Sequence, residues 1–162
     1  MKNVNIDFIL KATAGKLKGK KNDIEVQSIC LDSRQAKEGA LFVPIVGEKV
    51  DAHDFIKKVY ESGIRASLSE REDIEVPEDM SIILVQNSVK ALQDIAKAYR
   101  ESINIPIVAI TGSVGKTTTK EMISLALSAQ KKVYKTPANQ NSQVGVPKTV
   151  LESDLSADVI VI

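Results

Sequence analysis

A short apolar segment followed by a glycine-rich turn and a helical pattern constrains the fold of this chain more than any other feature. The segment Ile105–Ile110 has the continuous hydrophobicity of a buried strand, and it leads into Thr-Gly-Ser-Val-Gly-Lys-Thr-Thr-Thr from Thr111. A helical pattern then runs from Thr117 to about Ala129. Such a turn directs backbone N–H groups and the positive end of a helix dipole toward one point. The sequence therefore predicts a site for a polyphosphate.

The residue types in this turn suit nucleotide chemistry. Lys116 can reach the β- and γ-phosphates of ATP, and the Thr117 hydroxyl can complete a Mg²⁺ shell, so both are candidate catalytic residues. The full pattern G-x-x-x-x-G-K-[ST] has Gly where this chain has Ile110, so the match is to a shortened form. A plain structural turn is the alternative, but the place of the turn between strand and helix favours nucleotide binding. The predicted cofactor contacts are Thr111, Gly112, Ser113, Val114, Gly115, Lys116, Thr117 and Thr118, with Thr117 also as the metal ligand.

Composition argues against several classes of protein. The net charge of +1 gives no general attraction to nucleic acid or to a membrane surface. Lys16–Lys21 is the only basic cluster, and we interpret it as a solvated turn before a strand rather than a phosphate-binding patch. A single cysteine, Cys30, fits a reducing compartment, and no apolar run approaches the length of a membrane span. A cytoplasmic protein without membrane insertion is expected.

The rest of the sequence predicts alternating helices and strands, which is typical of an α/β protein. Pro44 lacks an N–H donor, so its strand is expected at a sheet edge or bulged there. Asn104-Ile-Pro106 is the best domain boundary, because Pro106 stops the preceding helix. The predicted domains are residues 1–103 and 104–162. Helices are expected at 5–14, 53–62, 88–100 (capped by Ser88), 117–129 and 144–151, and strands at 23–32, 40–46, 66–69, 81–85, 105–110, 132–135 and 157–162.

The sequence stops inside a predicted apolar strand, at Ile162. A parallel sheet normally continues into further β-α units that cover both faces, so we expect the N-terminal part of a larger protein. A complete small protein with an exposed sheet edge is the alternative. On the first hypothesis, the apolar residues of 105–110 and 157–162 lack cover. The chain by itself is then expected to lack ligase activity, to self-associate through residues 105–162 or be poorly ordered there, and to bind ATP weakly.

Two further segments carry recognisable patterns. The first is Leu31-Asp-Ser-Arg34 with Gly39-Ala-Leu-Phe-Val43 and Gly47-Glu-Lys-Val-Asp-Ala-His-Asp-Phe55. The second is Thr136-Pro-Ala-Asn-Gln-Asn-Ser-Gln-Val-Gly-Val-Pro147. Together with the glycine loop and the Lys120-Glu121 pair that follows it, these segments resemble the Mur ligases, the ATP-dependent amide-bond ligases of peptidoglycan precursor synthesis. The resemblance covers nearly the whole chain and favours the family members that add D-alanyl-D-alanine.

This resemblance implies a small mixed α/β domain that holds the uridine nucleotide of UDP-N-acetylmuramoyl-tripeptide, followed by the first β-α-β units of a parallel-sheet ATPase domain. It implies ligation of D-alanyl-D-alanine to that substrate through an acyl-phosphate, with ATP and Mg²⁺. Ser33 would contact uracil, Arg34 the diphosphate, and the two asparagines the muramoyl-peptide carboxylate or a metal-bound water. The implied substrate contacts are Ser33, Arg34, Gly47, Asp51, His53, Asn139 and Asn141.

Structural roles compete with these assignments. Asn favours turns by itself, and Asp32-Ser-Arg34 could be a strand end with surface salt bridges. His53 is disfavoured as a general base, because no partner constellation is visible in the sequence. The family pattern has Gly and Asn where this chain has Ala138 and Ser142. Alternative functions are a non-catalytic module that binds the UDP-sugar-peptide, another Mur-type amide ligase, or an unrelated P-loop kinase or GTPase.

Overall fold

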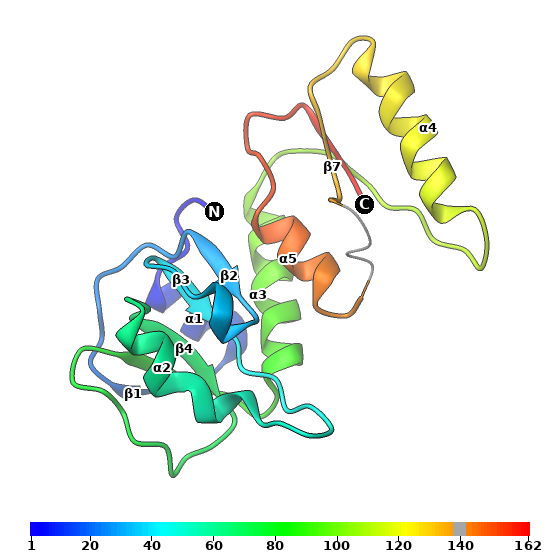
Figure 1. Ribbon diagram of the computed structural model, residues 1–162. Coiled ribbons are helices and arrows are strands. Elements are labelled where there is room, and N and C mark those ends of the chain that lie inside the picture. Colours follow the sequence, from blue (N-terminus) through cyan, green and yellow to red (C-terminus); the bar gives the residue numbers. More distant parts are fainter. Residues whose placement is uncertain (138–141) are drawn as a thin grey trace.

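The computed structural model describes residues 1–137 and 142–162, which form two sheets with helices packed against them (Figure 1). In the first sheet, the strand order is β1-β5-β4-β3-β2, and every neighbouring pair except β1–β5 is parallel. None of the described helices is long and apolar enough to cross a bilayer. The elements of this first unit are α1 (Ile6–Thr13), β1 (Lys16–Gly19), β2 (Ser28–Cys30), η1 (Ser33–Gln35), β3 (Ala40–Phe42), η2 (Ala52–Phe55), α2 (Ile56–Glu61), β4 (Ala66–Ser69), β5 (Ser81–Leu84) and α3 (Ser88–Ser102).

The first sheet is buried on both faces, because successive strand residues point to opposite sides. On β3, Leu41 packs into a cluster with α1 and α3, whereas Phe42 packs into a second cluster with Ile56 and Val59 of α2. Both β3 side chains are fully buried. Burying each such side chain stabilises the fold by roughly 1.5–3 kcal/mol. Helices on two faces leave the carboxyl ends of the parallel strands open for a site.

Helix α3 follows the predicted amphipathic pattern, with Leu92, Ile95 and Tyr99 on its buried side. Its cap differs from the prediction: the N-cap is Asn87, whose side chain accepts a hydrogen bond from the Lys90 N–H at 2.8 Å. Asn and Ser are similarly good caps, so the sequence alone did not separate the two neighbours.

The second sheet has the order β6-β8-β7 and is parallel throughout. Its elements are β6 (Ile107–Val108), α4 (Lys116–Ser128), β7 (Val133–Lys135), α5 (Gly145–Leu151) and β8 (Val159–Val161). The prediction that the last strand lacks cover is wrong, because Val159, Ile160 and Val161 are buried. The crossover places β8 between the two earlier strands, so both of its edges are paired. Ile107 and Val108 of β6 are only half-buried.

Helix α5 packs against the first unit. Val150 and Leu151 belong to the same hydrophobic cluster as α1, α3 and one face of the first sheet. Ile107, Val144 and Ile162 pack against that cluster from the second unit. The two units therefore share a core, and Figure 1 shows α5 alongside α3.

Three strand predictions need correction. Lys16–Gly19 is a strand, β1, rather than a solvated turn, and the lysines of this region have internal partners: Lys18 Nζ donates to the Glu72 carbonyl, and Lys20 pairs with Asp79 at 2.8 Å. The strand predicted at 23–32 is confined to β2. Pro44 marks no edge, because β3 ends at Phe42 and lies between β4 and β2.

Candidate functional site

The glycine loop leads from β6 into α4 as predicted. Gly112 and Gly115 have φ values of 150° and 79°, in the region that favours glycine. Gly115 is the N-cap of α4, and no side chain caps this helix. The first N–H groups of an α-helix have no partner within the helix, so this end presents free donors and a positive dipole. The loop is exposed on both sides of Lys116, whose Nζ donates to the Gly112 carbonyl oxygen at 2.5 Å.

A second lysine joins α4 to the segment that follows β7. Lys120 lies in the second turn of α4, and its side chain is only 11% exposed. Its Nζ donates to the carbonyl oxygen of Thr136 at 3.0 Å and lies 3.5 Å from a carboxylate oxygen of Glu121. Glu121 also pairs with Lys135 at 2.5 Å, and these lysines hold the pKa of Glu121 below its usual range. The start of the 136–143 segment is thus held beside the phosphate-loop helix.

At the carboxyl end of β2, Asp32, Ser33 and Arg34 form a tight turn. The Asp32 carboxylate caps η1 by accepting from the Arg34 N–H at 3.0 Å, and it binds the Arg34 guanidinium through Nε (2.9 Å) and Nη2 (2.6 Å). Hydrogen bonding from the Arg34 side chain lowers the pKa of Asp32 to about 2. Arg34 is 81% exposed, so its remaining donors face solvent. This turn can present a cation and a hydroxyl to an anionic ligand.

The next loop along the same sheet edge, between β3 and η2, is a small hairpin. Val46 bridges Asp51, and the Gly47 N–H donates to the Val50 carbonyl at 2.9 Å. Val46 and Val50 are 57% and 55% exposed. Gly47 and Asp51 therefore shape the hairpin, while its two exposed valines offer apolar surface.

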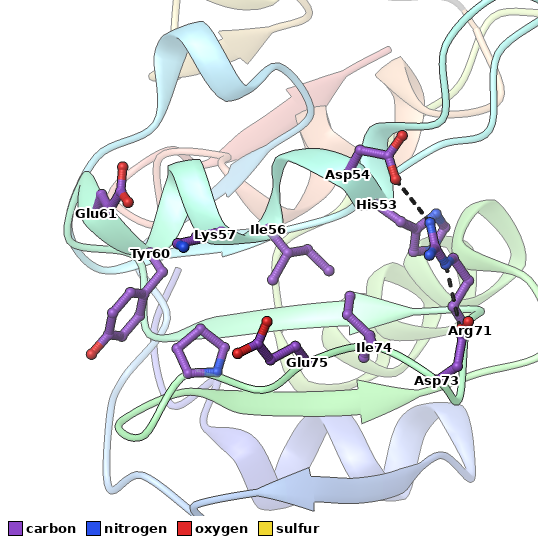
Figure 2. A pocket seen from close by; sticks show the side chains of 11 residues that line it. His53, Asp54, Ile56, Lys57, Tyr60, Glu61, Arg71, Asp73, Ile74 and Glu75 are labelled. Carbon is purple, nitrogen blue, oxygen red and sulfur yellow. Dashed lines mark hydrogen bonds and ion pairs between the residues drawn. The ribbon is translucent and has the colours of Figure 1, made fainter.

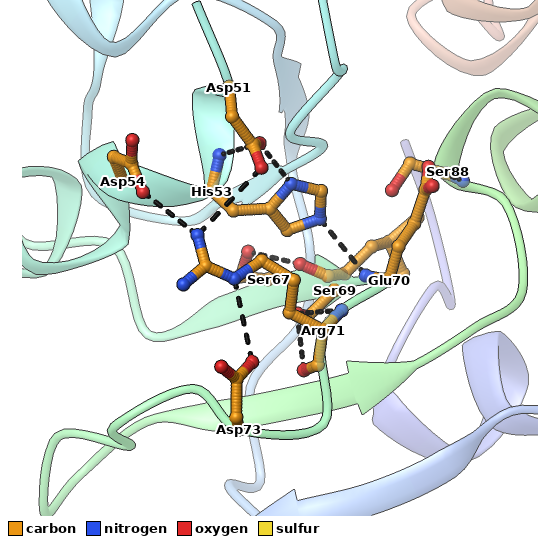
Figure 3. A network of polar contacts seen from close by, with 10 residues as sticks. Asp51, His53, Asp54, Ser67, Ser69, Glu70, Arg71, Asp73 and Ser88 are labelled. Carbon is orange, nitrogen blue, oxygen red and sulfur yellow. Dashed lines mark hydrogen bonds and ion pairs between the residues drawn. The ribbon is translucent and has the colours of Figure 1, made fainter.

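His53 is completely buried and joins three parts of the edge (Figure 3). Its Nδ1 lies 2.5 Å from Asp51 Oδ1, and its Nε2 accepts from the Glu70 N–H at 3.0 Å. The hydrogen of a neutral ring is therefore on Nδ1. Burial would raise the pKa of Asp51, but hydrogen bonds from the His53 N–H and ring outweigh it, so that pKa lies below its usual range. Glu70 Oε1 then accepts from the Ser88 N–H at 2.7 Å, at the start of α3.

Arg71 completes this network. Its guanidinium contacts Asp54 at 2.9 Å, Asp73 at 3.5 Å and Asp51 at 3.8 Å. His53 thus links the hairpin, through Asp51, to the residue after β4, Glu70, and both of its ring nitrogens form hydrogen bonds. We call this arrangement the His53 clamp. The geometry leaves His53 no free nitrogen to serve as a general base.

A cavity of about 350 Å³ lies between α2 and the segment 71–77 (Figure 2). Its lining mixes acidic and basic side chains over an apolar floor that includes Ile56 and Ile74. Among the substrate contacts predicted for the described residues, His53 lines this cavity, whereas Ser33, Arg34, Gly47 and Asp51 do not. The cavity therefore adjoins the sheet edge through His53 and Arg71 but does not include the turn at Ser33.

The predicted residues form two groups. Ser33, Arg34, Gly47, Asp51 and His53 gather at the carboxyl edge of the first sheet, and the loop Thr111–Thr118 forms the other group. The two groups belong to different sheets, so a substrate that contacts both would have to reach from one sheet to the other. The predicted contacts Asn139 and Asn141 lie outside the described residues.

The phosphates of ATP suit the loop better than a bare metal ion would. Thr117, at the start of α4, can give one hydroxyl oxygen to Mg²⁺, which usually binds one or two carboxylates plus phosphate oxygens. The described residues contain no cluster of three or more His, Cys, Asp or Glu side chains that could hold a metal. The chain's own contribution to a magnesium shell is therefore Thr117, with the remaining oxygens left to phosphate and water.

Several residues near these positions were not predicted to have a role. Lys120 stood out only as part of the family pattern, although a lysine one turn into a phosphate-loop helix is well placed to hold the next loop. Val46 and Val50 are exposed residues of the hairpin that contains Gly47. Apolar residues in an otherwise polar turn are a signal in the sequence that could have indicated a ligand contact. Lys58 acts electrostatically on Asp32 and adds positive charge near Arg34.

Comparisons with known proteins find matches to both units of the chain. Residues 25–100 match the model of the Mur ligase family, catalytic domain, and residues 110–162 match that of the Mur ligase middle domain. The UDP-N-acetylmuramoyl-tripeptide–D-alanyl-D-alanine ligase of Bacillus subtilis is 37% identical over 85% of this chain and 30% of its own length. The Escherichia coli ligase of the same name is 34% identical over 100% of this chain and 35% of its own length.

Solved structures give the same result. A crystal structure of MurF from Acinetobacter baumannii superimposes with a TM-score of 0.87 and 31% identity, over 98% of this chain and 35% of that one. MurF from Thermotoga maritima in complex with ADP gives 0.75 and 33%, over 86% of this chain and 32% of that one. The chain therefore spans about a third of the length of these relatives.

Proposed function

Because this chain belongs to the Mur ligase family, we propose that it is the part of a D-alanyl-D-alanine-adding ligase that holds two of the substrates. The first unit, residues 1–103, would bind UDP-N-acetylmuramoyl-tripeptide, and residues 104–162 would bind the phosphates of Mg-ATP. The whole protein would join D-alanyl-D-alanine to the tripeptide in the cytoplasm.

The open N-terminus of α4 is the observation that carries this proposal. Gly115 caps the helix with positive φ and without a side-chain bond, and Lys116 begins the helix. Free N–H groups, the helix dipole and an ammonium group then converge on one exposed point, which is how proteins bind polyphosphates. The ADP complex of the Thermotoga relative supports adenine nucleotide as the ligand.

The sheet edge supports the other substrate. Ligands of open α/β sheets lie at the carboxyl ends of the strands, where Ser33, Arg34 and the hairpin 46–51 meet. Arg34 has free donors for a diphosphate, and Ser33 has a hydroxyl for the base edge. Val46 and Val50 would add apolar contact with the uridine. We assign Asp51 and His53 to holding this hairpin in place.

Ligation needs a carboxylate made electrophilic by phosphorylation. The work of the protein is then to position the phosphoryl group and to neutralise its charge. Lys116 and the N–H groups of the loop would neutralise that charge, and Thr117 would contribute an oxygen to Mg²⁺. Lys120 would hold Thr136 beside α4 through its carbonyl. Asn139 and Asn141 remain proposed contacts of the muramoyl-peptide carboxylate.

Calorimetric titration of the 162-residue chain tests the two halves separately. Mg-ATP and UDP-N-acetylmuramoyl-tripeptide should each bind, and saturation with one should leave the site of the other available. Lys116→Ala should remove the ATP heat alone, and Arg34→Gln should weaken the UDP-substrate alone. Absence of both heats from a demonstrably folded sample would refute the proposal.

A non-catalytic module that binds the UDP-sugar-peptide is the second candidate, favoured by the exposed Arg34 guanidinium at the carboxyl end of β2. Phosphate release separates the two. A catalytic protein releases phosphate from ATP only when the UDP-substrate and D-alanyl-D-alanine are both present, whereas a binding module shows the two heats and no release.

A further inference from the structure

The outer edge of the first sheet is closed by a side chain from the second unit. Strand β2 is the edge strand, and the Cys30 carbonyl faces β3, where it accepts from the Val43 N–H at 2.9 Å. Neighbouring residues of a strand direct their backbone groups to opposite edges, so the Ile29 N–H points outward. Glu152 Oε1 accepts this hydrogen bond at 2.8 Å, across 123 positions of sequence.

Glu152 is held firmly from its own side. It is the C-cap of α5, where its N–H donates to the Lys148 carbonyl at 2.9 Å, and its side chain is 29% exposed. Val150 and Leu151, just before it, are buried in the shared core. Lys148 Nζ lies 4.0 Å from the other carboxylate oxygen of Glu152. This ion pair is therefore weaker than the hydrogen bond between Glu152 and the Ile29 N–H.

Each partner leads directly into a proposed ligand site. Beyond Ile29, the chain passes through Cys30 into the turn of Ser33 and Arg34. Beyond Glu152, a short turn leads to β8, the strand that pairs with both β6 and β7. The phosphate loop follows β6, so one hydrogen bond ties the nucleotide-sugar edge to the sheet of the phosphate loop.

We propose that Glu152 is a positioning residue that fixes the spacing between these two sites. This inference rests on the proposed function, because a fixed spacing matters most when one substrate must reach from the first site to the second. Sheet-edge protection alone is the competing role, and it predicts a loss of stability without any change in how the units are spaced.

Three variants separate these roles. Glu152→Gln keeps an oxygen acceptor for the Ile29 N–H and removes the charge. Glu152→Ala removes both, and Lys148→Met removes the ion pair while leaving the acceptor. Glu101→Ala, at an exposed carboxylate near the end of α3, serves as the control for mutation itself.

The first measurement needs no ligand. We expect the Ile29 amide of Glu152→Ala to exchange with solvent at least about tenfold faster than in the parent, with Ile82 and Ile83 of β5 unchanged. Spin labels on cysteines introduced at Lys37 and Gln130, with Cys30 replaced by Ala, should give a narrow distance distribution in the parent and in the Gln and Met variants. The distribution should broaden in Glu152→Ala.

The second measurement compares ligands that reach one site or both. We expect Glu152→Ala to lose about tenfold in affinity for UDP-N-acetylmuramoyl-tripeptide, while its affinity for UDP stays within about twofold of the parent. Glu152→Gln should bind UDP-N-acetylmuramoyl-tripeptide as tightly as the parent. Equal losses for the two ligands, an unchanged Ile29 amide, or an equally narrow distance distribution in the Ala variant would overturn the inference. If the parent binds neither ligand, the proposed function fails, and the exchange and distance results still decide the role of Glu152.

Discussion

The ammonium group of Lys116 lies 2.5 Å from the carbonyl oxygen of Gly112, so the lysine of the phosphate loop bonds the backbone of its own loop. This bond uses one of the three ammonium donors and keeps the charge at the mouth of the loop. The other two donors can bind a phosphate, and a bond between an ammonium group and a phosphate oxygen is strong because both groups are charged.

We predict that Lys116→Ala abolishes measurable ATP binding by this chain. In a full-length ligase, the same change should slow turnover by on the order of a hundredfold or more, since comparable electrostatic contacts supply about 3–4 kcal/mol. Titration calorimetry and steady-state rates check this. Lys131→Ala, at an exposed lysine just beyond the other end of α4, is the matched control and should change neither quantity.

Arg34→Gln should weaken binding of UDP-N-acetylmuramoyl-tripeptide by roughly 10- to 100-fold, because a hydrogen bond to a charged group contributes about 1.5–3 kcal/mol. Arg100→Gln, at an exposed arginine near the end of α3, removes the same charge far from the sheet edge and should bind normally. Equal affinities for the parent and Arg34→Gln would place the diphosphate elsewhere.

The His53 clamp predicts a graded loss of stability. His53→Phe removes both ring contacts and leaves the Glu70 N–H without its acceptor, so we expect the free energy of unfolding to fall by about 1–3 kcal/mol. His53→Asn can still donate to Asp51 from near the Nδ1 position and should lose less. Urea unfolding of the three proteins measures the series, and equal stability of all three would show that the clamp contributes nothing.

Acid should weaken the same network through Asp51. Its pKa in the folded chain lies below the ordinary value of 3.8, so the ionised carboxylate stabilises the fold above that value. This contribution is lost as the pH falls from about 4 through the lowered pKa. We therefore expect the stability gap between the parent and Asp51→Asn to be widest at neutral pH and to close on acidification, as followed by urea unfolding at several pH values. A stability gap that widens in acid would contradict a stabilising role for the ionised Asp51 carboxylate.

Self-association through residues 105–162 remains a prediction, although its basis has moved from β8 to α4. Met122 and Leu125 are 67% and 78% exposed and line a groove of about 360 Å³ with Val133. Exposed apolar surface of this kind favours association. Sedimentation velocity should show concentration-dependent dimers or larger species that disappear in a Met122→Glu, Leu125→Lys variant. A monomer at all concentrations in the parent would end this prediction.

Much of the fold could be predicted because local patterns decided it. The spacing of Leu92, Ile95 and Tyr99 marks α3, and the glycine turn before Lys116 marks the start of α4. The strand β1 was missed because the partners of its lysine-rich segment lie far along the chain: Lys18 donates to the Glu72 carbonyl, and Lys20, just after the strand, pairs with Asp79. No local pattern contains those contacts.

In the site, too, features set by local sequence were predictable and features set by side-chain conformation or distant partners were not. The positions of Ser33 and Arg34 at the end of a parallel strand followed from sequence order and sheet geometry. The bidentate contact between Asp32 and Arg34 did not, because it depends on side-chain conformation within one turn. The role of His53 required its partner Glu70, which lies 17 positions away, just after β4, and offers only a backbone N–H.

The central position of β8 also sets an order of events during synthesis. Strands β6 and β7 each pair with β8 and not with each other. A ribosome adds roughly 5–20 residues per second and releases the N-terminal part first, so the phosphate loop emerges well before its sheet can close. The first unit can fold early, whereas the loop acquires its final geometry only when Val159–Val161 pairs with both β6 and β7. Nucleotide binding should therefore appear only after Val159–Val161 has been synthesised and has paired with both strands.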